Sequence, residues 1–373
     1  MRKVRLGYVS PLLAKIGGPT AASSPPSQTM EHWHVTVVHA PGSVEHFYHF
    51  LLGFFVPLIF HLFRKWEHAQ FSRLIIRSCG PLDLLIRELG DNRIKIIDKD
   101  EHRQIVGSAV CNSATCTDIL MPAKLRFVTI HGCDYPAAYD KRKFARAREA
   151  LLSIDSIRSE MRSLNDHWPR GNARILLIQR GPSLDFYHSE RSERKRSGQE
   201  RRSIANHEEL HQWLRLDHDG CLNVIPERLT FGHQFALFSS ADIIIAQHGA
   251  ALANILWARP SATVIEILPS TLSSDRKDLF RCLARCMGLR YRRVRQDHEH
   301  SDVDIEEIRE VVKEAIAAPA CRVMSRLRST GFKIFGPAIP MRQWLCPFIE
   351  HLLTGSASGP APRKRQGAAA ERD

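Results

Sequence analysis

The chain has 373 residues, which favours two domains because a single domain usually spans about 100 to 200 residues. With 43% hydrophobic and 25% charged residues, its composition is that of a globular protein and excludes an extended disordered chain. Lysine and arginine number 53 against 40 acidic residues, so the formal charge of +13 favours anionic partners such as nucleotides, nucleic acids or a membrane surface.

Cysteine usage and apolar stretches indicate a cytoplasmic protein. The nine cysteines form no C-x-x-C pair, which argues against a disulfide framework and a closed zinc site. The basic N-terminus meets Pro11 before an apolar signal core can form. The most apolar stretch, residues 47–63, approaches the length of a membrane span but contains two histidines and a proline. A buried helix is therefore the simpler interpretation.

The first half of the chain alternates short apolar runs with amphipathic segments. This pattern predicts strands at 33–38, 74–76 and 93–97 and helices at 44–63 and 82–89. The alternation is typical of a Rossmann-like domain. A charged, helical stretch at 141–170 follows, and we expect the domain boundary within it.

The second half repeats the alternation more clearly. It predicts strands at 175–178, 222–225, 242–246 and 263–268 and helices at 207–214, 231–239, 249–257 and 276–287. Short strands that are apolar on both faces are typical of a parallel sheet covered by helices on both sides. We therefore expect the α/β class, with a doubly wound sheet.

These elements divide the chain into five expected segments. In order they are an N-terminal strand and flexible loop (1–30), a Rossmann-like acceptor domain (31–165), a second Rossmann-like domain that binds the donor (166–300), C-terminal helices (301–354) and a disordered basic tail (355–373). We expect the helix at 305–317 to return toward the first domain.

The strand at 242–246 runs into a turn at His248 and Gly249. In an open parallel sheet, ligands bind beyond the carboxyl ends of the strands, where helix N-termini present free N–H groups to phosphate. Gly249 and Ala250 leave the backbone accessible to a diphosphate, and His248 can donate a hydrogen bond to it. A tight turn with a satisfied histidine is the alternative interpretation.

Polar residues near other strand ends add to this candidate site. Glu266 is an acid inside an apolar strand, and a buried carboxylate needs a partner, either a ribose diol or an arginine. Arg180, Arg202 and Asn206 fall on loops at the same edge of the sheet. Guanidinium groups suit a diphosphate because their donors form a planar fork.

The order of these motifs resembles the signature of glycosyltransferase family 61. The signature reads Arg180, Arg202-x-Ile204-x-Asn206, Phe231-x-x-Gln234, Ala241-Asp242, His248-Gly249-Ala250-x-Leu252-x-Asn254 and Glu266-x-x-Pro269. The resemblance implies a GT-B-like architecture, with two Rossmann-like domains facing a central cleft, and inverting transfer from a nucleotide sugar, with uridine favoured. It implies donor-binding roles for Arg180, Arg202, Asn206, His248, Gly249, Ala250, Asn254 and Glu266.

Residues 47–58 also resemble the family's N-terminal pattern, in which a histidine precedes an acidic residue and a Pro-Leu pair. Gly53 stands at the acidic position. Inverting transfer needs a base that takes the proton of the acceptor hydroxyl. We expect His49 to be this base, with His46, Glu45 and Asp134 as further candidates. A histidine capped by backbone inside a core helix is the alternative for His49.

We therefore expect a metal-independent glycosyltransferase without a permanently bound cofactor, whose donor substrate is a nucleotide-diphospho-sugar, in particular a UDP-sugar. The acceptor would be a glycan or lipid-linked glycan in surface or capsular polysaccharide synthesis, with peripheral contact to the anionic inner face of the membrane. One alternative is a nucleotide-sugar-binding protein that has lost its base. Another is a basic nucleic-acid-binding protein, but the charge is scattered and no aromatic residues interleave with it, so no nucleic acid is expected.

Overall fold

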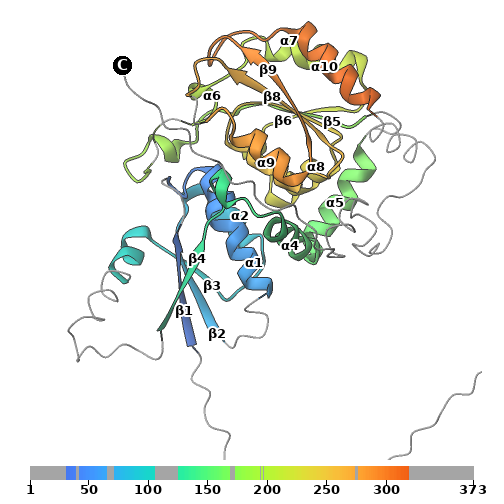
Figure 1. The fold of residues 1–373 in the computed structure, drawn as a ribbon. Helices are drawn as coiled ribbons and strands as arrows, with labels where there is room; N and C mark the ends of the chain where they lie inside the picture. The colour runs from blue at the N-terminus through green and yellow to red at the C-terminus, as the bar shows by residue number, and fades with distance from the viewer. Residues whose placement is uncertain are drawn as a thin grey trace, which may run out of the picture.

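The computed structural model describes residues 31–38, 42–64, 71–105, 125–168, 173–193, 195, 197–273 and 276–318. These residues form two parallel β-sheets with helices packed against them, as Figure 1 shows. The α/β class with parallel sheets is thereby confirmed. The segments predicted at 1–30 and 355–373, and the part of 301–354 after residue 318, lie outside the described residues.

The first sheet has four parallel strands. They are β1 (Glu31–Val38), β2 (Phe71–Arg77), β3 (Ile94–Ile97) and β4 (Leu125–His131), in the spatial order β3-β2-β1-β4. The order changes direction between β1 and β4, and ligands bind in open α/β sheets at such a switch point. The segments that follow β1 and β4 are therefore the ones to search for a site.

A long buried helix follows β1. The predicted helix at 44–63 is a π-helix, η1 (His49–Phe55), that continues into α1 (Val56–Arg64). In a π-helix the hydrogen bonds span five residues, and the Val56 N–H accordingly bonds to the Leu51 carbonyl. The Leu52 carbonyl accepts instead from Cys133 N–H after β4, at 2.8 Å. This bond ties the two segments at the switch point together.

The second sheet has five parallel strands. They are β5 (Ile175–Ile178), β6 (Cys221–Val224), β7 (Ile243–Gln247), β8 (Thr263–Pro269) and β9 (Arg290–Gln296), in the spatial order β6-β5-β7-β8-β9. Counted along the chain, the order is flavodoxin-like, and the switch point lies between β5 and β7. The sequence motifs at Arg180 and His248 thus flank the switch point of this sheet.

Helices cover both faces of the second sheet. On one face, α7 (His207–Asp217) and α10 (Ile305–Ala317) pack on Ile175, Leu177 and Ile243. On the other face lie α8 (Phe231–Ser240), the 3₁₀-helix η6 (Ala250–Trp257) and α9 (Leu279–Met287). The expectation that α10 returns toward the first domain is wrong, because its apolar side chains Ile308 and Val312 are buried in the core of the second sheet.

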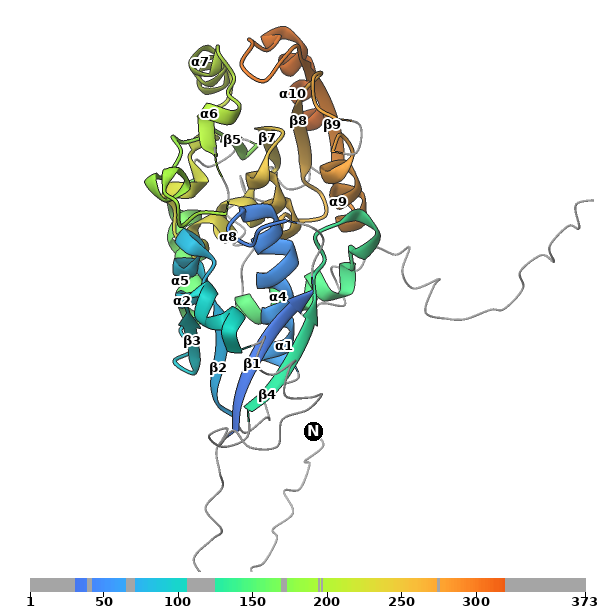
Figure 2. The same ribbon diagram turned by 90° about the vertical axis from the view of Figure 1, so that its left-hand side faces the viewer.

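A continuous apolar core joins the two sheets. Helix α4 (Lys141–Leu152) packs on α1, and α5 (Asp155–His167) packs on α8 (Figure 2). The rings of Phe55 and Phe231 meet edge to face at 4.8 Å between centroids. The shorter helices are η2 (Gly80–Leu82), α2 (Asp83–Arg87), η3 (Pro136–Ala138), η4 (Asp185–His188), α6 (Gly198–Arg201) and η5 (Pro226–Arg228).

Glu88, which follows α2, caps helix α8 from the first half of the chain. Its Oε2 accepts from the N–H groups of Phe231 and Gly232, at 2.7 and 3.2 Å. Because the first N–H groups of a helix have no intrahelical partner, we expect Glu88→Ala to lower the free energy of unfolding by about 1 to 2 kcal/mol in urea titrations. Glu88→Gln keeps an acceptor and should lose less. Equal stability of both variants and the wild type would contradict this role.

Among the residues described, no helix is both long and apolar enough to cross a membrane.

Candidate active site

A pocket of about 980 Å³ lies between the two sheets. Its walls include the segments that follow β1 and β4 of the first sheet and those that follow β5 and β7 of the second. The switch points of both sheets therefore open into the same cavity. His49 and Asp134 line one part of it, and Arg180, Arg202 and His248 line another.

The first sheet contributes a histidine–carboxylate pair. His49 Nδ1 lies 2.9 Å from Asp134 Oδ2, and the carboxylate is fully buried while the imidazole remains 16% exposed. A carboxylate can only accept, so this contact places the proton of a neutral His49 on Nδ1. The Nε2 atom is then an acceptor that makes no hydrogen bond to a described residue. The pair can take a proton from a bound hydroxyl group.

Two backbone features bring this pair together. The Leu52 carbonyl holds the segment that precedes Asp134 through Cys133 N–H, as described above. Gly42 passes so close to the imidazole that a Cβ atom there would lie 2.3 Å from His49 Nε2. Any larger residue at position 42 would displace the histidine.

The other base candidates have different surroundings. His46 lines the pocket, and its ring lies 5.6 Å from that of His49. Glu45 is buried and does not line the pocket, and its Oε2 accepts from Glu193 N–H at 2.7 Å and from Ser192 Oγ at 3.3 Å. Both bonds leave Glu45 as a structural anchor rather than a base.

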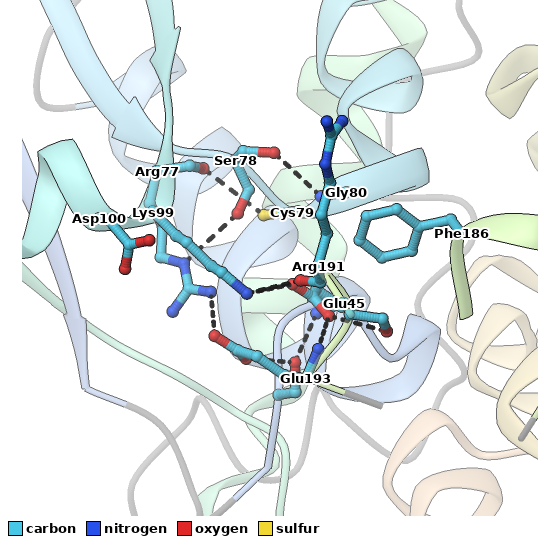
Figure 3. A network of polar contacts seen from close by, with 12 residues as sticks. Glu45, Arg77, Ser78, Cys79, Gly80, Lys99, Asp100, Phe186, Arg191 and Glu193 are labelled. Atoms are coloured by element: carbon cyan, nitrogen blue, oxygen red, sulfur yellow. Dashed lines mark hydrogen bonds and ion pairs between the residues drawn. The ribbon is translucent and has the colours of Figure 1, made fainter. Parts of the chain in front are cut away.

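Glu45 belongs to a polar network beside the pocket (Figure 3). Lys99 Nζ donates to the Arg191 carbonyl at 2.6 Å, and Arg77 at the end of β2 pairs with Glu193 at 2.8 Å. The network fastens residues 191–193, which lie between β5 and β6, to the first sheet. No sequence motif indicates it, because its members are far apart along the chain.

The second sheet contributes an arginine cluster. Arg180 Nη2 and Arg202 Nη1 both donate to the His248 carbonyl, at 2.6 and 3.3 Å. Their Nε atoms are buried without a hydrogen-bond partner among the described residues. Burial and the neighbouring guanidinium groups lower the pKa of each to about 10. Arg201 and Arg276 also line the pocket, so this wall is suited to an anionic ligand.

Gly249 provides the space that Arg180 occupies. A Cβ atom at position 249 would lie 1.8 Å from Arg180 Nη2. Ala250 starts η6 directly after it, and the first N–H groups of a helix have no intrahelical partner. The Arg180 guanidinium group therefore lies at the turn that precedes η6.

Glu266 contacts two side chains that belong to the second sheet and its loops. It is fully buried, its Oε1 lies 2.5 Å from His248 Nδ1, and its Oε2 accepts from the hydroxyl of Tyr291. Both carboxylate oxygens are therefore in contact with protein side chains, and neither of these two partners is an arginine. Glu266 orients His248, whose ring also packs on Phe280 at 5.1 Å.

Two predicted donor-binding asparagines do not line the pocket. Asn206 is bonded to the backbone of Val303 through both its amide nitrogen, at 3.0 Å, and its amide oxygen, at 2.9 Å. Asn254 is fully buried and donates to Gln234 Oε1 at 3.0 Å. Asn206 thus holds the segment at Val303 in place, and Asn254 links η6 to α8.

Sequence reasoning missed residues that support the arginine cluster. Gln247 and Gln296, at the carboxyl ends of β7 and β9, bond to each other at 2.6 Å and both donate to the Ser203 carbonyl, next to Arg202. The sequence signal that could have indicated them is the polar residue at the end of each of these two strands. Within the described ranges, no group of three or more histidine, cysteine or acidic side chains is arranged to hold a metal ion.

The fold and pocket define an α/β protein that can hold an anionic ligand beside a histidine–carboxylate pair. A family model described as Glycosyltransferase 61 matches residues 47–265, which is more than half of the chain. The chain therefore belongs to glycosyltransferase family 61 and is a glycosyl-transferring enzyme by family. Comparison with curated proteins found no match. The matched range contains His49, Asp134, Arg180 and His248.

Proposed function

We propose that the protein is an inverting glycosyltransferase with a GT-B-like arrangement of two Rossmann-like domains, at 31–165 and 166–300. Its donor is a nucleoside-diphosphate sugar, in particular a UDP-sugar, and its acceptor is a glycan hydroxyl in surface or capsular polysaccharide synthesis. One observation carries the proposal. One pocket is lined both by the histidine–carboxylate pair of His49 and Asp134 and by the cluster of Arg180 and Arg202. The Nε donors of these two arginines lack a partner among the described residues.

The proposed reaction is a single displacement. His49 Nε2 takes the proton of the acceptor hydroxyl while the hydroxyl oxygen forms a bond to the anomeric carbon of the donor sugar. The bond from that carbon to the diphosphate oxygen breaks on the opposite face, and the nucleoside diphosphate leaves with the electron pair. Arg180 and Arg202 stabilise the negative charge that develops on the leaving group. Because these cations can neutralise the diphosphate, we expect transfer to persist in the presence of EDTA.

A nucleotide-sugar-binding protein without transferase activity is the second candidate. Gly53 favours it, because this residue stands where the family pattern has an acid and lies buried within the π-helix η1. The two candidates differ in one observable. Release of nucleoside diphosphate in the presence of glycan acceptors supports the transferase, and donor binding without any release supports the binding protein.

Donor binding is tested by a thermal-shift screen with nucleoside diphosphates and nucleotide sugars. Ligand at about 100 times its Kd adds about 2.7 kcal/mol to the free energy of unfolding, which gives a clear shift. We expect one nucleotide to stabilise the wild type and to have no such effect on His248→Ala. The same nucleotide should still stabilise His211→Ala, a matched control on α7 away from the pocket. No shift with any nucleotide would contradict the proposed donor site.

A lipid-linked acceptor at an anionic membrane surface is supported by charge and by the rim of the pocket. The chain carries a formal charge of +13. Leu84 and Leu184, two large apolar side chains that are 67% and 41% exposed, line the pocket from its two halves. We expect the purified protein to sediment with anionic liposomes at low salt and to be released at high salt. Equal sedimentation with neutral liposomes would contradict the electrostatic contact.

A further inference from the structure

His248 is held through one ring nitrogen, and the other lies at the pocket. Its Nδ1 faces Glu266, and the ring is only 4% exposed. Its Nε2 makes no hydrogen bond to a described residue, although His248 lines the pocket. In the neutral imidazole the Nδ1 proton is donated to Glu266, so Nε2 carries a lone pair. Such an atom repels a phosphate oxygen unless it gains a proton.

Tyr291 affects how strongly Glu266 attracts the proton on His248 Nδ1. Its hydroxyl donates to Glu266 Oε2, and burial together with the adjacent carboxylate raises the pKa of this phenol, so it stays a donor. Arg293 Nε contacts the same hydroxyl at 3.4 Å. Glu266 is thus a buried carboxylate with one neutral donor on Oε2 and His248 on Oε1. This environment can stabilise an imidazolium at His248.

The charges around His248 favour the neutral ring while the pocket is empty. Burial lowers the pKa of His248, and Arg202 and Arg180 lower it further, while Glu266 opposes them. The titratable and charged groups around His248 and its partner Glu266 come from several elements. They are Glu266 from β8, Tyr291 and Arg293 from β9, Arg180 after β5, Arg202 after α6 and Arg276 before α9. A bound diphosphate would offset the arginine charges and reverse the balance.

We propose that binding of the nucleoside diphosphate is coupled to uptake of one proton by His248, with Glu266 as the positioning residue that holds the imidazolium and Tyr291 as the donor that occupies the second oxygen of Glu266. The proton comes from solvent and binds to Nε2, which then donates to a phosphate oxygen. This inference rests on the proposed donor site. Because bound protons favour binding, the affinity for the diphosphate falls as the pH rises above neutrality.

Calorimetry with UDP in buffers of different ionisation enthalpy at about pH 8 measures the uptake directly. At this pH the terminal phosphate of UDP, whose second pKa is about 6, is already ionised and contributes little. We expect uptake approaching about one proton per UDP in the wild type, since binding then changes the protonation of a single group. We expect the same uptake in His211→Gln, which alters a histidine on α7 away from the pocket.

Two isosteric variants test the roles of Glu266 and Tyr291. Glu266→Gln removes the charge that stabilises the imidazolium, so uptake should be abolished and UDP affinity lowered by about tenfold. Tyr291→Phe leaves Glu266 with one donor fewer and therefore more basic. His248 should then be protonated before UDP binds, and uptake should decrease. Circular dichroism and thermal unfolding establish that both variants fold.

The outcomes separate this inference from the proposed function. UDP binding without proton uptake in the wild type overturns the role of His248, and uptake unchanged in Glu266→Gln overturns the role of Glu266 in holding the imidazolium. Either result leaves the donor site intact. Absence of UDP binding overturns the donor site and this inference together.

Discussion

Replacing His49 with glutamine should lower kcat/KM for sugar transfer by about 10³-fold, because a positioned general base contributes roughly 10² to 10⁴-fold. Asp134→Asn should also lower kcat/KM, since the amide no longer fixes the proton of His49 on Nδ1. Steady-state kinetics with the donor and a glycan acceptor measure both losses.

Donor affinity distinguishes this effect from a general loss of structure. His49 and Asp134 lie on the wall opposite the arginine cluster, so both variants should bind UDP with wild-type affinity. His46→Gln is the matched control, because it removes a second histidine from the same part of the pocket, with its ring 5.6 Å from that of His49. Full activity of His49→Gln would show that another group is the base.

Arg202→Gln should weaken UDP binding by about 10²-fold, because it removes a charge-assisted hydrogen bond worth about 1.5 to 3 kcal/mol. Arg202→Lys should also bind UDP more weakly, since an ammonium group lacks the planar fork of donors. Isothermal calorimetry measures both. The exposed Arg215→Gln on α7 is the control for the loss of one positive charge.

Arg202→Gln should stabilise the protein when no ligand is bound. Burial and Arg201 lower the pKa of Arg202 to about 10, below its ordinary value of 12.5, so the folded state disfavours the charged guanidinium. That cost is fully present at neutral pH and declines only as the pH rises above about 10. Arg202→Gln should therefore unfold at a higher temperature near neutral pH. Lower stability together with unchanged UDP affinity would contradict a ligand-binding role.

The sequence pattern predicted the second sheet well where strands are apolar on both faces. Strands β5, β7 and β8 lie within one residue of their predicted bounds, because runs such as Ile243–Ile245 have no helical periodicity. It missed β9, which holds four arginines and forms the edge of the sheet, where only one neighbour covers it. Tyr291 was missed with it.

The site could be predicted only where its residues follow a strand in one motif. His248 and Gly249 form such a motif, and Arg180 follows β5. The contact between His49 and Asp134 depends on β4 lying beside β1, and no strand was predicted at 125–131. Likewise, the partners of Glu266 depend on the β8–β9 register, which places Glu266 beside Arg293. Long-range pairing, rather than local propensity, determines these contacts.

The structure of the protein with UDP bound tests the central claim most directly. We expect the diphosphate in the pocket between the two sheets, within hydrogen-bond distance of the Arg180 and Arg202 guanidinium groups and of the N–H groups at Gly249 and Ala250. The sugar-bearing end should point toward His49. A nucleotide bound elsewhere, with both arginines still bonded to the His248 carbonyl, would contradict the account.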